Sequence, residues 1–189
     1  MVSIASLWLA ILLSAVAVWI VSAIVWMVLP HHKKDFHALP DEAGAIAALK
    51  NQNLQPGRYN FPHLHSPAQL KEEENRRKFE EGPAGYLTVL PRGVPSMGRS
   101  MAIQFVTYLI VGGIVAYVAT RTLPAGADYL KVFQVTGTVA FVAYGVGSVQ
   151  DAIWFGRPWS DVGKNLFDAF LYGNFTGGVF GWLWPSVVV

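Results

Sequence analysis

The sequence predicts an all-α membrane protein with four transmembrane helices and a small mixed α/β cytosolic insert between helices one and two. Hydrophobic residues make up 53% of the 189 residues and charged residues 14%, which is more apolar than an ordinary soluble domain. Of the 14 Lys/Arg and 12 Asp/Glu residues, 18 lie between Lys33 and Arg99, so one polar segment interrupts long apolar runs. A run of about 20 apolar residues suffices to cross a hydrocarbon core.

The first apolar run has no charge from Ile4 to Leu29. It is followed by His31-His32-Lys33-Lys34 instead of a small-residue cleavage site, so we expect a retained anchor rather than a signal peptide. Three further apolar runs follow the polar segment. The predicted spans are residues 4–29, 101–120, 129–152 and 162–186, and the predicted insert is residues 30–99.

The distribution of basic residues predicts the orientation. The insert and the loop after the third span together hold twelve Lys/Arg, whereas the loop after the second span, with the start of the third, holds only Arg121 and Lys131. Because basic side chains near a span resist translocation, we expect the insert in the cytosol and both termini in the periplasm.

The insert contains patterns of short helices and strands. Ser66-Pro67-Ala68-Gln69 is a helix-starting pattern, and Gly82 is a stop. Along that helix Glu72, Glu73 and Glu74 each precede a basic residue by four positions, so we expect the charges to neutralise one another. The predicted elements are helices at residues 41–51 and 67–81 and a strand pair at residues 58–61 and 86–90.

All five histidines lie within the predicted insert. Imidazole nitrogens, with a nearby carboxylate such as Asp35, are ligands for Zn²⁺, Ni²⁺ or Cu²⁺. A helical His-x-x-x-His pair is missing, so solvated or hydrogen-bonded histidines are the competing interpretation and no metal is assigned. The candidate ligands are His31, His32, His37, His63 and His65.

Several function classes are disfavoured. No histidine lies within a span, which argues against haem held between helices, and no cofactor is expected. Basic residues of the insert are balanced by acids, which argues against a nucleic-acid partner. Neither a nucleophile turn nor a phosphate-binding glycine loop is present, so we expect a protein that is not an enzyme.

Small residues recur every four positions in the predicted fourth span, and more weakly in the second. Such a face lets another helix backbone approach closely, in the same bundle or in another subunit. The predicted packing residues are Ala169, Gly173, Gly177, Gly181, Gly112 and Ala116.

Charged residues gather around the loop between the third and fourth spans. We expect Arg157 to pair with Asp151 or Asp161, and Lys164 to lie close to Asp168. Lipid head-group binding by the two basic residues is the alternative interpretation.

The Gly156-Arg157-Pro158-Trp159 turn, Asp168 and the closing Phe180-Gly181-Trp182-Leu183-Trp184-Pro185 resemble a group of small bacterial inner-membrane proteins of unassigned function. The resemblance covers about the last forty residues and implies a location in the bacterial inner membrane. It implies no activity or site.

The leading functional hypothesis is a non-enzymatic accessory or scaffold subunit of a larger inner-membrane complex. The small-residue faces favour it, and its partners would be the lipid bilayer and other membrane subunits or a second copy of the chain. The alternatives are a homo-oligomeric channel or transporter and a metal-handling membrane protein that uses the insert histidines.

Overall fold

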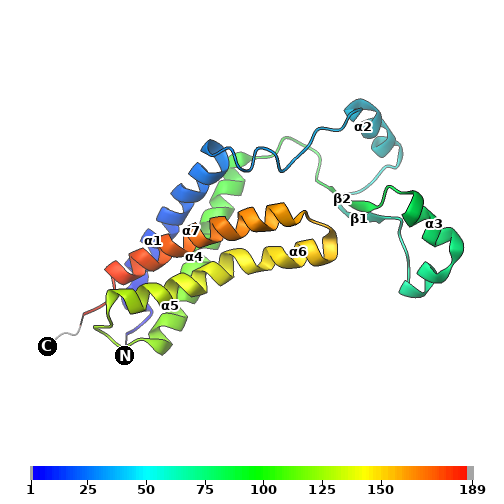
Figure 1. Ribbon diagram of the computed structural model, residues 1–189. Helices are drawn as coiled ribbons and strands as arrows, with labels where there is room; N and C mark the ends of the chain where they lie inside the picture. The colour runs from blue at the N-terminus through cyan, green and yellow to red at the C-terminus, as the bar shows by residue number, and fades with distance from the viewer. Residues whose placement is uncertain (1, 187–189) are drawn as a thin grey trace. The chain divides into compact units, whose positions relative to one another are not determined.

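The computed structural model describes residues 2–186. Residues 1 and 187–189, the chain ends expected in the periplasm, lie outside the described residues. The described chain is mostly helical and has a small two-stranded sheet (Figure 1). Its contacts define two units, one formed by Met1–Asp35 with Ser96–Val189 and the other by Phe36–Pro95.

The first unit consists of long helices. A 3-10 turn and a π-helical turn extend α1 at its two ends, and a second π-helical turn, Val142–Val146, joins α5 to α6. In the described residues, three helical stretches are long and apolar enough to cross a membrane: Ala5–Val28, Met97–Thr122 and Tyr129–Phe155. The helices are α1 (Trp8–Ala23), α4 (Met97–Thr122), α5 (Tyr129–Phe141), α6 (Gly147–Phe155) and α7 (Trp159–Trp182).

Local sequence sets the ends of these helices. Leu29 is extended because it precedes Pro30, and this stops the first helix. The Ser96 side chain caps α4 by accepting a hydrogen bond from the Arg99 N–H at 3.3 Å. Gly156 adopts the left-handed conformation with φ of 68° and turns the chain from α6 into α7.

The small-residue face of α7 lies against α5 in the same chain. A Cβ atom added at Gly173 would lie 2.8 Å from the carbonyl oxygen of Gly137, and one added at Gly177 would lie 2.8 Å from that of Phe133. One added at Gly181 would lie 2.7 Å from the Tyr129 ring. These three positions of α7 therefore have no room for a side chain.

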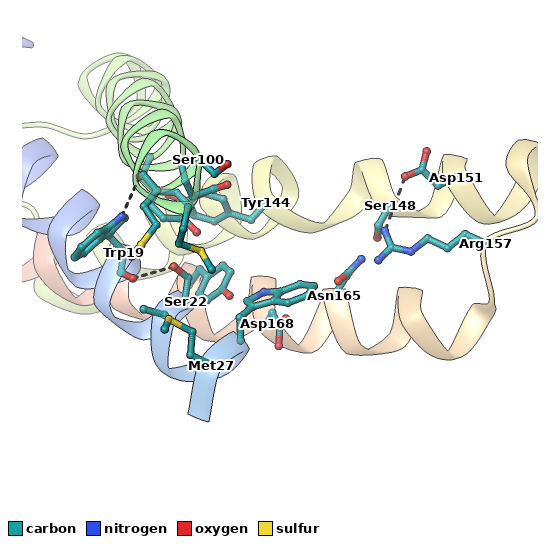
Figure 2. A pocket seen from close by; sticks show the side chains of 17 residues that line it. Trp19, Ser22, Met27, Ser100, Tyr144, Ser148, Asp151, Arg157, Asn165 and Asp168 are labelled. Atoms are coloured by element: carbon teal, nitrogen blue, oxygen red, sulfur yellow. Dashed lines mark hydrogen bonds and ion pairs between the residues drawn. The ribbon is translucent and has the colours of Figure 1, made fainter. Parts of the chain in front are cut away.

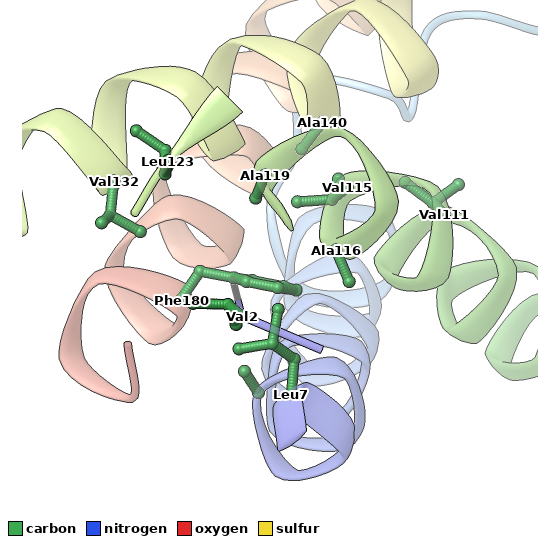
Figure 3. Packing of buried hydrophobic residues seen from close by; sticks show 11 residues of the cluster. Val2, Leu7, Val111, Val115, Ala116, Ala119, Leu123, Val132, Ala140 and Phe180 are labelled. Atoms are coloured by element: carbon green, nitrogen blue, oxygen red, sulfur yellow. The ribbon is translucent and has the colours of Figure 1, made fainter. Parts of the chain in front are cut away.

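The remaining predicted packing residues also make contacts within the chain. A Cβ atom added at Gly112 of α4 would lie 3.2 Å from the Ile11 side chain of α1. A Cβ atom added at Gly145 would lie only 2.7 Å from the Cβ of Ala169 in α7. Ala116 is fully buried in a core cluster that includes Leu7, Val115 and Phe180 (Figure 3). This cluster joins α4 and α7 to the segment that leads into α1.

The second unit contains α2 (Glu42–Asn51), β1 (Gly57–Phe61), α3 (Glu73–Glu81) and β2 (Gly85–Val89). The two strands pair antiparallel, with Tyr59 opposite Leu87, which confirms the predicted strand pair. The Asp41 side chain caps α2 by accepting from the Gly44 N–H at 2.9 Å.

The prediction of one continuous helix over residues 67–81 is wrong. A 3-10 turn, Pro67–Lys71, and α3 are separated by Glu72, whose backbone is extended. The Asn75 side chain donates to the Gln69 carbonyl at 3.1 Å and to the Glu72 carboxylate at 2.9 Å. These bonds satisfy polar groups at the break in place of helical hydrogen bonds.

The charge pairs of this segment differ from the predicted set for the same reason. Glu74 pairs with Lys78 at 2.7 Å, as expected, and Lys78 lowers the pKa of Glu74 below its usual value. Glu72 and Glu73 do not pair with Arg76 and Arg77 among the described contacts. Because Glu72 lies outside α3, the two arginines instead pair forward along the helix, Arg76 with Glu80 at 3.3 Å and Arg77 with Glu81 at 3.5 Å.

Candidate functional site

A cluster of ionisable side chains joins the end of the first helix to α7. After the π-helical turn, Pro30 turns the chain and brings His31, His32 and Asp35 toward the α7 residues Lys164 and Asp168. We call these five residues the histidine–aspartate cluster. All five belong to the first unit.

Asp168 accepts from both histidines. Its Oδ1 lies 3.0 Å from His31 Nε2, and its Oδ2 lies 2.7 Å from His32 Nε2. The Asp168 side chain is only 4% exposed and that of His32 only 3%. The His32 ring also stacks on Trp26, with ring centroids 3.9 Å apart and planes 2° from parallel. His32 is therefore held in one orientation.

The second nitrogen of His32 has its own carboxylate partner. His32 Nδ1 lies 2.6 Å from Asp35 Oδ2, and Lys164 Nζ forms an ion pair with Asp35 Oδ1. The Lys164 ammonium, with help from His32, holds the pKa of Asp35 below its usual 3.8. Asp35 therefore stays ionised and fixes both the imidazole and the lysine.

The charges in the cluster do not balance unless a further positive charge is added. Two nearly buried carboxylates, Asp35 and Asp168, contribute two negative charges, and Lys164 contributes one positive charge. Buried charge is costly when it is not compensated. A bound cation would supply the missing positive charge.

The ligand atoms for a cation lie close together. Three possible ligand atoms, one nitrogen each from His31 and His32 and one oxygen from Asp168, lie within 4.8 Å of one another. Among the described residues, these three side chains form a group that could hold a metal ion. Tetrahedral zinc with ligands at about 2.0–2.1 Å needs ligand atoms about 3.3 Å apart. The ligand atoms are up to 4.8 Å apart, so binding of an ion would draw the more distant ones together by as much as about 1.5 Å.

The five histidines proposed from the sequence fall into two groups. His31 and His32 belong to the cluster, whereas His37, His63 and His65 belong to the second unit. His63 Nδ1 lies 2.7 Å from Asn60 Oδ1, and its ring lies 5.0 Å from that of His65. No group of three ligands forms around His37, His63 or His65 within residues 2–186.

The expected proximity of Lys164 to Asp168 does not appear among the described ion pairs. The Lys164 ammonium is taken by Asp35, and both Asp168 oxygens are taken by histidines. These partners come from the segment that follows the first helix, which is distant in sequence from Lys164 and Asp168.

Arg157 lies between its two expected acids but contacts both at long range. Its guanidinium nitrogens are 3.9 Å from Asp151 and 4.0 Å from Asp161. The Asn165 amide lies closer, and its oxygen can accept from both Arg157 Nη atoms at 2.9 Å when the amide is oriented toward them. Arg157 is thus held mainly by a neutral amide.

A cavity of about 550 Å³ adjoins the cluster through Asp168. Side chains from α1 and its π-helical turn, α4, the α5–α6 helix and α7 line it, as Figure 2 shows for Trp19, Met27, Ser100, Tyr144 and Asp168. Apolar side chains dominate the end formed by α1 and α4, and Ser148, Arg157 and Asn165 form the polar end. Both π-helical turns contribute to the lining, which fits the frequent occurrence of such turns at functional sites.

From the sequence, His31 and His32 were predicted as candidate metal ligands and Asp168 as part of an ion-pair group, without a link between them. One signal could have joined them: the predicted topology brings the end of the first span and the start of the fourth to the same side of the membrane. Asp168, the deepest acid of the predicted last span, then needs a partner from another part of the chain.

The comparisons with known proteins give no match to a family model, to a curated protein or to a solved structure. The resemblance of the last forty residues to bacterial inner-membrane proteins therefore stays a prediction.

Proposed function

We propose that this chain is an integral membrane protein that binds one divalent transition-metal ion through His31, His32 and Asp168. The observation that carries the proposal is the convergence of two imidazoles on one nearly buried carboxylate. Two histidines and a carboxylate suit zinc or ferrous iron. This proposal differs from the expectation that the chain has no cofactor. It also differs from the metal-handling hypothesis drawn from the sequence, because Asp168 takes the place of His37, His63 and His65 as a ligand.

The surroundings of the ligands support this assignment. A metal-ligating histidine usually donates its other ring N–H to a carboxylate, which fixes the tautomer and raises the basicity of the ligand nitrogen. Asp35 stands in that position to His32, at 2.6 Å from Nδ1, and Lys164 holds Asp35 in turn. Three protein ligands would leave the ion a position for water or another ligand.

The test is a zinc titration of the full chain, purified in detergent with a tag free of histidine and stripped with a chelator. We expect one zinc per chain for the wild type, measured by elemental analysis and by competition with a chromophoric chelator. His32→Gln and Asp168→Asn should each weaken binding by at least about 100-fold, since each removes one ligand of three.

His37→Gln is the matched control, because His37 is exposed and lies outside the cluster. It should bind zinc as the wild type does. The assignment would be refuted if His32→Gln and the wild type bound zinc with equal affinity while circular dichroism showed that both are folded. Failure of the wild type to bind zinc, ferrous iron or manganese would refute it as well.

We further propose that α7 is the fourth membrane span. At 24 residues and a rise of 1.5 Å per residue it is about 36 Å long, which is enough to cross a bilayer core. Its outer face carries exposed Phe167, Phe170 and Phe175, and its polar Asp161 and Asp168 are buried against the rest of the first unit. Polar residues directed inward lower its mean hydropathy without preventing it from spanning.

The proposed location is the bacterial inner membrane, with both termini periplasmic and the insert cytosolic, on the basis of the basic-residue bias. The accessory-subunit and channel hypotheses stay predictions. The small-residue face of α7 that favoured them is occupied by α5 within the chain. It therefore does not offer a surface to a partner.

A further inference from the structure

We propose that the cavity between α1, α4, α6 and α7 binds a zwitterionic phospholipid, with its phosphate at Arg157, its ammonium at Asp151 and its apolar part among the side chains of α1 and α4. The inference goes beyond metal binding. It rests on the proposed placement of these helices in a membrane but does not depend on the metal.

The mouth of the cavity is suited to an apolar environment. Met27 is 65% exposed, Met97 is 67% exposed and Trp26 is 49% exposed, and all three line the cavity. Such side chains are unfavourable in water but ordinary against lipid tails. Methionine also adapts its shape to a flexible chain. This end of the cavity therefore suits an acyl chain.

The polar end of the cavity carries both signs of charge. Arg157 and Asp151 both line it, and their charged groups are separated by 3.9 Å, longer than a direct hydrogen bond (Figure 2). Each keeps part of its surface accessible, with 31% of the Arg157 side chain and 53% of the Asp151 side chain exposed. A head group that bears a phosphate and an ammonium complements this pair, whereas a purely anionic head group would face Asp151 and Asp168.

The Tyr172 hydroxyl inside the cavity has no hydrogen-bond partner among residues 2–186. Tyr172 lines the cavity and is only 7% exposed, and its hydroxyl lacks a partner of hydrogen-bond geometry among the described residues, although the Trp26 indole lies nearby. A buried hydroxyl without a partner is costly. An ester or phosphate oxygen of a bound lipid would accept its hydrogen bond.

The experiment measures lipid retention by native mass spectrometry. The full chain is delipidated in detergent and equilibrated with mixed micelles that contain either phosphatidylethanolamine or phosphatidylglycerol. We expect one phosphatidylethanolamine per chain and at least about tenfold less phosphatidylglycerol. Equal retention of the two lipids, or no retention of either, would overturn the proposal.

A matched pair of variants locates the binding site. Ser148 lines the cavity, whereas a Cβ added at the adjacent Gly147 meets no atom within 4 Å. Ser148→Phe should lower phosphatidylethanolamine retention about tenfold by filling the cavity, and Gly147→Phe should leave it unchanged. Equal retention by the two variants would place the lipid elsewhere on the protein and refute the site.

A subtler variant covers the case in which Ser148→Phe fails to fold. Tyr172→Phe removes only the hydroxyl oxygen and should lower retention roughly threefold, the loss expected for one hydrogen bond. Unchanged retention in Tyr172→Phe would remove the hydroxyl from the proposal and overturn it in its present form. Zinc is measured in the same samples, so that zinc binding without lipid retention rejects the lipid site alone, and lipid retention without zinc rejects the metal site alone.

Discussion

Lys164 forms its ion pair with Asp35, a residue 129 positions earlier in the chain, and not with Asp168 one turn further along its own helix. This contact connects α7 to the segment that follows the first helix. It leaves both oxygens of Asp168 to the histidines.

The Lys164–Asp35 pair predicts a specific loss of stability. Lys164→Met keeps the aliphatic length and removes the charge, and the Asp35 side chain is only 5% exposed. We expect a loss of about 1–3 kcal/mol at pH 7, reduced from the fully buried case because Lys164 is partly exposed. Thermal unfolding in detergent measures it, with the exposed Lys34→Met as the control.

The same pair predicts a pH dependence. The folded-state pKa of Asp35 is lowered, so its contribution to stability is present above about pH 3.8 and is lost as the pH falls through the lower folded value. The difference in melting temperature between wild type and Lys164→Met should shrink as the pH falls below about 4. A difference that stays constant from pH 7 to pH 3 would contradict the pairing.

The contact between α5 and α7 predicts opposite effects at two adjacent glycines. A Cβ at Gly177 would lie 2.8 Å from the Phe133 carbonyl oxygen, whereas a Cβ at Gly178 would meet only the Tyr129 hydroxyl at 3.7 Å. Gly177→Ala should destabilise the protein by about 1–3 kcal/mol. Gly178→Ala should be neutral or stabilising by up to about 1 kcal/mol, because alanine favours a helix over glycine. Equal melting temperatures for the two variants would exclude this packing.

The long contacts of Arg157 predict weak coupling to its acids. Double-mutant cycles of Arg157→Ala with Asp151→Ala and with Asp161→Ala should each give a coupling energy below about 1 kcal/mol, as for other pairs separated by about 4 Å near the surface. Thermal unfolding in detergent provides the measurement. A coupling above about 2 kcal/mol would mean that the arginine is tightly latched to that carboxylate.

The proposed topology predicts the accessibility of three positions. Tags at the two termini should be reached by protease or by a membrane-impermeant label from the periplasmic side of spheroplasts, and a tag inserted next to Glu74 should be reached only after the membrane is opened. Labelling of the insert in intact spheroplasts would reverse the orientation, and labelling of only one terminus would exclude α7 as a span.

Local patterns in the sequence predicted the helices and the strand pair because hydropathy, capping and turn residues act over a few positions. The strand pair at residues 57–61 and 85–89 follows from such signals. The break at Glu72 does not, since it depends on how Asn75 satisfies the polar groups around it. The two π-helical turns were also not predicted, because the apolar periodicity of 3.6 residues does not distinguish them from an α-helix.

The candidate site was harder to predict because its members come from distant segments. The sequence identified His31, His32, Asp35, Lys164 and Asp168 individually, but their pairing depends on α1 packing beside α7, which no local periodicity encodes. The partner of Lys164 was also predicted wrongly. Asp168 on the same helix was expected, but Asp35, which is distant in sequence, forms the ion pair.

Asp168 and His32 are separated by 136 positions; Asp168 belongs to the last long helix, and His32 follows the first one. During synthesis the first helix leaves the ribosome long before α7 does. The two histidines can therefore contact the Asp168 carboxylate only after the final segment has been made. A nascent or truncated chain would hold the imidazoles without this partner. Closure of the contact is thus a late step in the biogenesis of the chain.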